Sequence, residues 1–113
     1  MKTEVRFHGL EPSESLREHA ARRIHFHLSR FGHDLTAVVV RIGDVNGPKG
    51  GLDKRCRITV RGPRLGSATL DEYSGDIWSA VDLATERVAR NVGRTLEKTR
   101  GFARGDRFER RES

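Results

Sequence analysis

The segment RVARNVGRTLEK, from Arg87 to Lys98, carries regularly spaced positive charges. Its basic residues Arg87, Arg90, Arg94 and Lys98, here called the basic stripe, follow one another at steps of three, four and four. On a helix this spacing places them on one side, where guanidinium groups can bind phosphates. Basic residues late in a helix also oppose its dipole. However, Arg90 and Arg94 form a like-charged i,i+4 pair, which is mildly unfavourable, so the stripe favours binding of a polyanion.

A second basic group, with Arg22, Arg23 and Arg30, stands earlier in the chain near Phe26. An aromatic ring among arginines can stack on a nucleic-acid base, although we interpret Phe26 as a residue at the rim of the core. Two lysines in and after a Gly/Pro-rich segment could reach a phosphate as secondary contacts. The predicted phosphate-binding residues are Arg22, Arg23, Arg30, Arg87, Arg90, Arg94, Lys98, Lys49 and Lys54.

Other chemistry finds little support in the sequence. His25 and His27 are two residues apart, so on a helix they point in different directions and cannot easily share a metal ion. The run GDVNGPKGG lacks the order of a nucleotide-binding P-loop. No Ser-His-Asp order, paired metal carboxylates or nucleophile elbow stands out. We expect no catalytic residue, metal, cofactor or small-molecule substrate, and we interpret Cys56 as a small core residue.

Composition supports a polyanionic partner. The chain has 113 residues and a formal net charge of +6, with a pI near 10.4 and a mean hydropathy of −0.66. Arginine supplies 18 of the 22 basic residues; it suits phosphate recognition, but genomic base composition could also enrich it. One cysteine allows no internal disulfide, and no apolar run suits a signal peptide or a membrane span. We therefore expect a cytoplasmic protein that does not bind membranes.

The apolar spacing predicts two helices and four strands to position these side chains. The predicted elements are a strand around Val5 and Phe7, a helix from Ser13 to Phe31, strands over Thr36–Gly43, Lys54–Gly62 and Gly66–Tyr73, and a helix over Gly75–Arg100. This β-α-β-β-β-α order predicts an α+β fold, a mostly antiparallel four-stranded sheet with both helices packed on one face. We expect one domain over residues 1–100 and a charged, disordered tail over 101–113.

The second helix sorts its charges by side. Its apolar line is centred about 120° from the basic stripe at 100° per residue. We therefore expect the stripe to flank the buried seam, with Asp82, Glu86 and Glu97 on the more outward arc. Tyr73 and Trp78, near the start of this helix, are interpreted as packing residues.

The order of elements, the helix opening EPSESL and the run YSGDIWSAVD resemble the ribosome hibernation promoting factor family, also called ribosome-associated inhibitor A. In that family the second helix typically begins close to DMYAAID. The residues from Asp76 to Asp82 follow this pattern, with Trp78 at the family's tyrosine. Downstream basic positions of the family match Arg87, Arg90 and Arg94.

The resemblance covers about residues 3–100 and implies a concrete function. Such proteins bind the small ribosomal subunit at the decoding centre, across the mRNA and tRNA channel, and block translation during stress or stationary phase. Basic residues along both helices hold the rRNA. The sequence shows no second domain of the kind that long members use for ribosome dimerisation, so we expect the short form and a monomer off the ribosome. Whether it pairs ribosomes or silences single ones stays open.

Three alternatives remain. A general RNA-binding or RNA-chaperone module would use the open face of the sheet, where the sequence gathers Arg6, Arg41, Arg55, Arg57 and Arg61. A small enzyme acting on RNA would turn RNA over on incubation. A protein-interaction adapter would bind through an apolar patch and would show little salt dependence.

Overall fold

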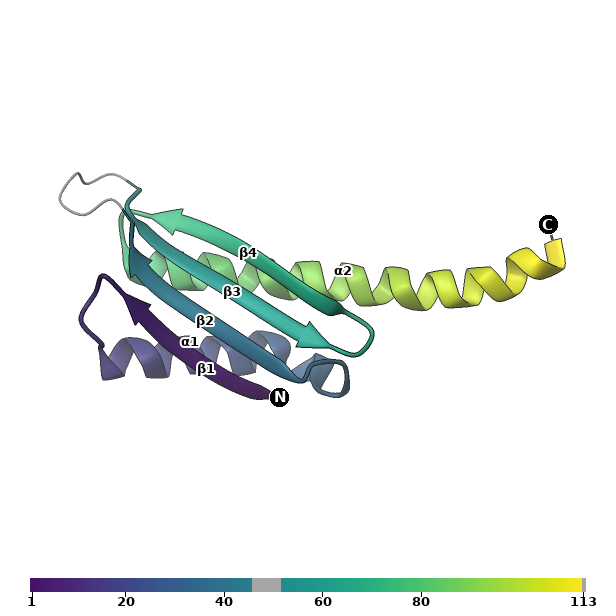
Figure 1. The fold of residues 1–113 in the computed structure, drawn as a ribbon, viewed down its shortest axis with the longest axis horizontal. Helices are drawn as coiled ribbons and strands as arrows, with labels where there is room; N and C mark the ends of the chain where they lie inside the picture. Colours follow the sequence, from purple (N-terminus) through teal and green to yellow (C-terminus); the bar gives the residue numbers. More distant parts are fainter. Residues whose placement is uncertain (46–51, 113) are drawn as a thin grey trace.

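The structure is a computed structural model that describes the backbone of residues 1–45 and 52–112 and the side chains of these residues up to Thr99. Its elements are β1 (Lys2–His8), α1 (Glu14–Leu28), the 3-10 helix η1 (Ser29–Asp34), β2 (Ala37–Asp44), β3 (Lys54–Gly62), β4 (Gly66–Ser74) and α2 (Ile77–Glu112). Figure 1 shows these elements in the β-α-β-β-β-α order that the sequence predicts.

The four strands form one sheet in the order β1-β2-β3-β4. β1 pairs with β2 in parallel, because α1 and η1 carry the chain back between them, and the other two pairings are antiparallel. Both helices cover the same face of the sheet (Figure 1). The predicted α+β fold, with its mostly antiparallel sheet and its two helices on one face, is therefore confirmed.

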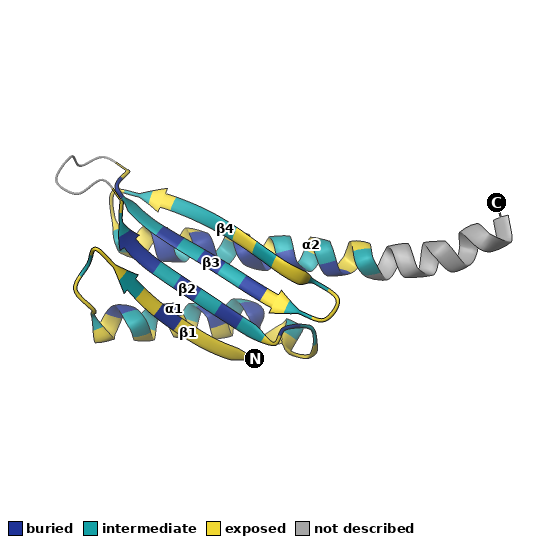
Figure 2. Cartoon of the chain, in the orientation of Figure 1, coloured by how far each residue is buried: buried dark blue, intermediate teal, exposed yellow. Residues whose placement is uncertain are grey.

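The core lies between the sheet and the helix pair. Alternate residues of the central strands are fully buried there, namely Val38, Val40, Ile42, Cys56, Ile58 and Val60. From the helices the core takes Leu16, Ala20, Ile24, Leu28, Val81, Ala84, Val88, Val92 and Leu96. Figure 2 shows the alternation along β2 and β3. Cys56 is thus a core residue, as predicted, and its burial raises the pKa of the thiol to about 12.

The first helix ends earlier than predicted. α1 stops at Leu28, and the chain continues as η1, with a kink at Phe31. A 3-10 segment is a common ending for an α-helix, and apolar spacing alone does not distinguish the two. The ring of Phe31 lies against α2 at Gly93, where an added Cβ would stand 3.5 Å from the ring. Gly93, a weak point by helix propensity, therefore leaves room for this ring.

The second helix is longer than predicted. α2 continues to Glu112 instead of ending at Arg100; the disorder expected for residues 101–113 stays a prediction. This segment has no proline and is rich in arginine and glutamate, which are good helix formers. Local propensity can thus extend a helix after its apolar periodicity has ended. The division into a domain over residues 1–100 and a tail stays a prediction.

Candidate nucleic-acid interface

Side-chain caps fix where both helices begin. The hydroxyl of Ser13 accepts a hydrogen bond from the backbone N–H of Leu16 at 3.2 Å. The carboxylate of Asp76 accepts one from the backbone N–H of Ser79 at 3.1 Å. Both residues were predicted near helix starts, since such caps depend on local sequence. The helices begin at the same end of the sheet and run side by side in the same direction (Figure 1).

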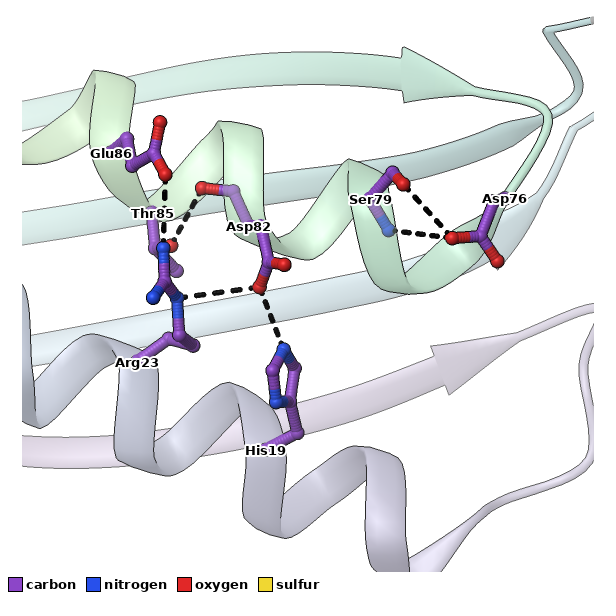
Figure 3. A network of polar contacts seen from close by, with 7 residues as sticks. All are labelled: His19, Arg23, Asp76, Ser79, Asp82, Thr85 and Glu86. Atoms are coloured by element: carbon purple, nitrogen blue, oxygen red, sulfur yellow. Dashed lines mark hydrogen bonds and ion pairs between the residues drawn. The ribbon is translucent and has the colours of Figure 1, made fainter.

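An ion-pair network joins the two helices at their seam (Figure 3). A hydrogen bond of 2.7 Å links His19 Nε2 and Asp82 Oδ1. The Arg23 guanidinium lies between two carboxylates, with Nε 3.3 Å from Asp82 Oδ1 and Nη2 3.0 Å from Glu86 Oε2. Its side chain is only 27% exposed. Arg23 therefore holds the helices together, and a phosphate would compete with these two carboxylates for its guanidinium.

The position of these carboxylates corrects the predicted sorting of charges on α2. Asp82 and Glu86 face α1, not the outward arc. Leu83 lies on the outward side instead and is 44% exposed. Because α1 also packs against α2, the acidic arc turns toward α1 and the basic stripe turns toward solvent.

Three arginines meet in a hollow on the outer side of the helix pair. The hollow is lined by Arg30, Phe31, Ala89, Arg90, Gly93, Arg94, Leu96 and Glu97, and we call Arg30, Arg90 and Arg94 the basic triad. The guanidinium of Arg30 stands 4.6 Å from the centre of the Phe31 ring, which it covers. All three arginines are exposed, and within the described part of the chain none forms an ion pair with a carboxylate. Such unpaired guanidinium groups can bind phosphate oxygens.

The other predicted phosphate contacts on the two helices lie outside the hollow of the basic triad. Arg22 and Lys98 are exposed, and Lys98 shares a second hollow with Arg94 on the side of β4. Arg87 is exposed but forms an ion pair with Glu72 of β4. A phosphate would therefore compete with this carboxylate for Arg87. Among the predicted contacts that the structure describes, the exposed residues without a carboxylate partner are Arg22, Arg30, Arg90, Arg94 and Lys98.

Of the two secondary lysines, Lys54 is held by two carboxylates away from this surface. Lys54 Nζ lies 3.0 Å from Asp53 Oδ2 and 3.3 Å from Asp44 Oδ2. The hydrogen bond with Asp53 is the main cause that raises the pKa of Lys54. This lysine is charged but engaged at the base of the loop. Lys49 falls outside the described residues.

Phe26 was predicted at the rim of the core, but it lies on the surface. The side chain is 74% exposed, and its ring meets His27 edge-on at 5.0 Å between centroids. On α1 it lies one turn after the exposed Arg22, whereas Arg30 belongs to η1. An exposed ring one turn from an exposed arginine is a surface on which a base can stack. Burial, together with the nearby Arg23, lowers the pKa of His27, so this histidine is neutral at pH 7.

The opposite face of the sheet carries five arginines: Arg6, Arg41, Arg55, Arg57 and Arg61. Arg6 binds Glu4 at 2.8 Å, and Arg57 makes two hydrogen bonds with Asp71, at 2.7 and 3.0 Å. These bonds are the main causes that lower the pKa values of both carboxyl groups. Tyr73, interpreted from sequence as a packing residue, lies on this face and is 42% exposed. Trp78 at the start of α2 is 39% exposed and packs edge-on against His19, with 4.9 Å between the ring centroids, so it is a packing residue, as predicted.

The described residues contain neither a cluster of metal-ligating side chains nor a helix that could span a membrane. No group of three or more His, Cys, Asp or Glu side chains among them could hold a metal ion. No helix in the described part of the chain has the length and apolar character to cross a membrane.

Comparison with known proteins gives one family and one fold. The sequence model of the family described as sigma 54 modulation protein / S30EA ribosomal protein matches residues 3–100. No curated protein matches the chain. The Protein Y N-terminal domain from Thermus thermophilus is similar in structure, with a TM-score of 0.68 and 22% identity over 83% of this chain and 98% of that one. A ribosomal subunit interface protein from Coxiella burnetii reaches a TM-score of 0.73 at 18% identity, over 86% and 99%.

Proposed function

The chain belongs to the sigma 54 modulation protein / S30EA ribosomal protein family, and we propose that it binds the small ribosomal subunit and inhibits translation by occupying the decoding region. The membership confirms the resemblance predicted from the sequence. It also agrees with a binding protein that is not an enzyme. The Coxiella burnetii neighbour is described as a ribosomal subunit interface protein, which supports the ribosome as the partner.

The observation that carries the proposal is the basic triad. Arg30, Arg90 and Arg94 come from two helices and surround one hollow, with no carboxylate bound to any of them in the described chain. The ion pairs of Arg23 hold the two helices in register at the seam. The backbone positions of the triad are therefore fixed before rRNA binds, and only the three side chains must be ordered on binding.

The proposed mechanism is steric. The helix pair docks on rRNA phosphates, and the body of the domain then stands in the channel that mRNA and tRNA use. No chemical step is required, because an occupied channel cannot accept a new message. We further propose that this occupancy serves stress or stationary phase, when idle ribosomes are preserved in the cytoplasm.

Charge reversal within the triad tests this proposal. The double variant Arg90→Glu/Arg94→Glu should no longer sediment with small subunits, because two attractive phosphate contacts become repulsive. The fold should persist, since both side chains are exposed and neither forms an ion pair with a carboxylate among the described residues. If about six phosphates are neutralised, the affinity of the wild-type protein should fall with salt roughly as the −4 to −5 power.

A matched variant carries the same change of charge on the opposite side of the molecule. Arg41→Glu/Arg61→Glu alters two arginines of the open sheet face and should retain sedimentation with the small subunit. Undiminished sedimentation of Arg90→Glu/Arg94→Glu would remove the basis of the proposal, and so would an equal loss in both variants.

A further inference from the structure

The face of the sheet opposite the helices is uncovered by any element in the described part of the chain (Figures 1 and 2). The strand registers place the same alternate residues of all four strands on it. Its charged or aromatic members are Lys2, Glu4, Arg6, His8, Arg41, Arg55, Arg57, Arg61, Asp71 and Tyr73. We call this surface the open face.

The open face has an excess of positive charge that its own acids do not neutralise. Both acids are already engaged, Glu4 by Arg6 and Asp71 by Arg57. Four more cations form no ion pair within the described residues: Lys2, Arg41, Arg55 and Arg61. After internal pairing the surface therefore presents about four free positive charges over four strands.

Stability does not explain this arrangement. Arg41 and Arg57 stand directly opposite each other in the β2–β3 register, where like charges are unfavourable. Arg55 has a buried Nε with no hydrogen-bond partner among the described residues. A sheet selected only for stability would place acids or neutral residues at these positions. The arrangement is instead complementary to an anion that comes from outside.

The shape of the open face suits a chain of phosphates. A shallow hollow is lined by Arg6, Ala37, Val39, Arg41, Thr59, Arg61, Ser67 and Thr69. Its floor is made of small side chains, so a phosphate can approach the sheet between the arginines, and hydroxyl groups offer further hydrogen bonds. Tyr73 lies at the edge, opposite Arg55 in the β3–β4 register, and its exposed ring can stack on a base.

We infer that the open face is a second nucleic-acid surface, which binds a short single-stranded RNA segment laid across the strands. About three nucleotides fit a four-stranded sheet of this kind. RNA is favoured over an acidic protein because the surface combines arginines with an exposed edge aromatic and hydroxyl groups. This function goes beyond docking on the small subunit. It uses residues that lie on the other side of the sheet from the basic triad.

A fluorescein-labelled oligouridine of twelve nucleotides tests the inference by fluorescence anisotropy. The wild-type protein should bind it, with an affinity that falls roughly as the third power of salt concentration for four phosphates on a single strand. Arg41→Glu/Arg61→Glu should weaken binding by about tenfold or more, while Arg90→Glu/Arg94→Glu should change it by less than about threefold. Tyr73→Ala should weaken it by about fivefold or more through lost stacking. Thermal unfolding should show both double variants folded, and Arg41→Glu should be well tolerated beside Arg57.

Several results would overturn the inference. These are no binding by the wild-type protein, unchanged binding by Arg41→Glu/Arg61→Glu, or a loss confined to Arg90→Glu/Arg94→Glu. Displacement of the RNA by polyglutamate of equal charge, at equal concentration, would assign the face to an acidic protein instead. Sedimentation with small subunits is measured separately. A negative result with the oligouridine therefore leaves the proposed ribosome binding intact, and a negative sedimentation result leaves the inference about the open face intact.

Discussion

Phe26 and Phe31 are the same residue type five positions apart, but they do different things. Phe26 is 74% exposed beside arginines, whereas Phe31 packs against the core and against α2. Phe26→Ala should weaken binding to the small subunit by about fivefold or more, because a base would lose its stacking partner. The free energy of unfolding should change by less than about 0.5 kcal/mol. Filter binding and urea denaturation measure the two effects.

Phe31→Ala is the matched control for that substitution. It removes the same ring from a packed position, so it should lower the free energy of unfolding by about 1–3 kcal/mol. A destabilisation by Phe26→Ala as large as that by Phe31→Ala would contradict the surface role of Phe26.

At the residue scale, the residues that cap the two helices were predictable, whereas the directions in which helical side chains point were not. The caps Ser13 and Asp76 follow from residue type and position, because a cap contacts a backbone group only two or three residues away. The exposure of Phe26 and the inward turn of Asp82 depend on how α1 rotates against α2. That rotation is set by contacts between residues about 60 positions apart, which spacing along one helix does not contain.

At the element scale, the packing of α1 against α2 gives two adjacent arginines different roles. Arg23 pairs with Asp82 and Glu86 across the seam, whereas its neighbour Arg22 is exposed. Arg23→Ala should lower the free energy of unfolding by about 1 kcal/mol, because it leaves two adjacent carboxylates without their cation. Arg22→Ala should leave stability unchanged and should reduce the salt slope of ribosome binding by about 1. Identical stability losses in the two variants would contradict the distinction.

The strand pair β3–β4 should show an acid-dependent stability. The hydrogen bonds of Arg57 lower the pKa of Asp71 below its ordinary value of 3.8. A lowered carboxyl pKa stabilises the fold above 3.8, and this contribution is lost as the pH falls through the still lower pKa of the folded state. Asp71→Asn should therefore be less stable than wild type at pH 7, with a gap that closes toward pH 2. Chemical denaturation of both proteins between pH 7 and pH 2 measures this difference in the free energy of unfolding. A difference that stays constant with pH would contradict the stabilising role of the Arg57–Asp71 pair.

The order of the elements was predictable because each has a clear apolar period and a clear start. The ends of both helices were not. α1 changes to η1 at Ser29 in a sequence whose apolar spacing runs on to Phe31. α2 continues past Arg100 where the apolar spacing ceases. Where a helix ends is decided by helix propensity and by packing over a single turn. The free energy at stake there is smaller than that of burying a whole apolar face, which decides whether the helix forms.

At the scale of the molecule, charge is divided between two sides of one sheet. The helix side presents the basic triad, and the other side presents the open face with Arg41, Arg55 and Arg61. The sequence predicted both sets of arginines, since periodicity assigns residues to faces. Which of these arginines share one hollow, namely Arg30 with Arg90 and Arg94, is set by the parallel packing of α1 and α2.

This division makes the helix side the docking surface for the small subunit in our account. Chemical footprinting of small-subunit rRNA, with wild-type protein and the two double variants, tests that claim most directly. We predict protection of decoding-region nucleotides by the wild-type protein and by Arg41→Glu/Arg61→Glu, and its loss with Arg90→Glu/Arg94→Glu. Protection confined to another part of the subunit, or persisting when the triad is reversed, would contradict the account.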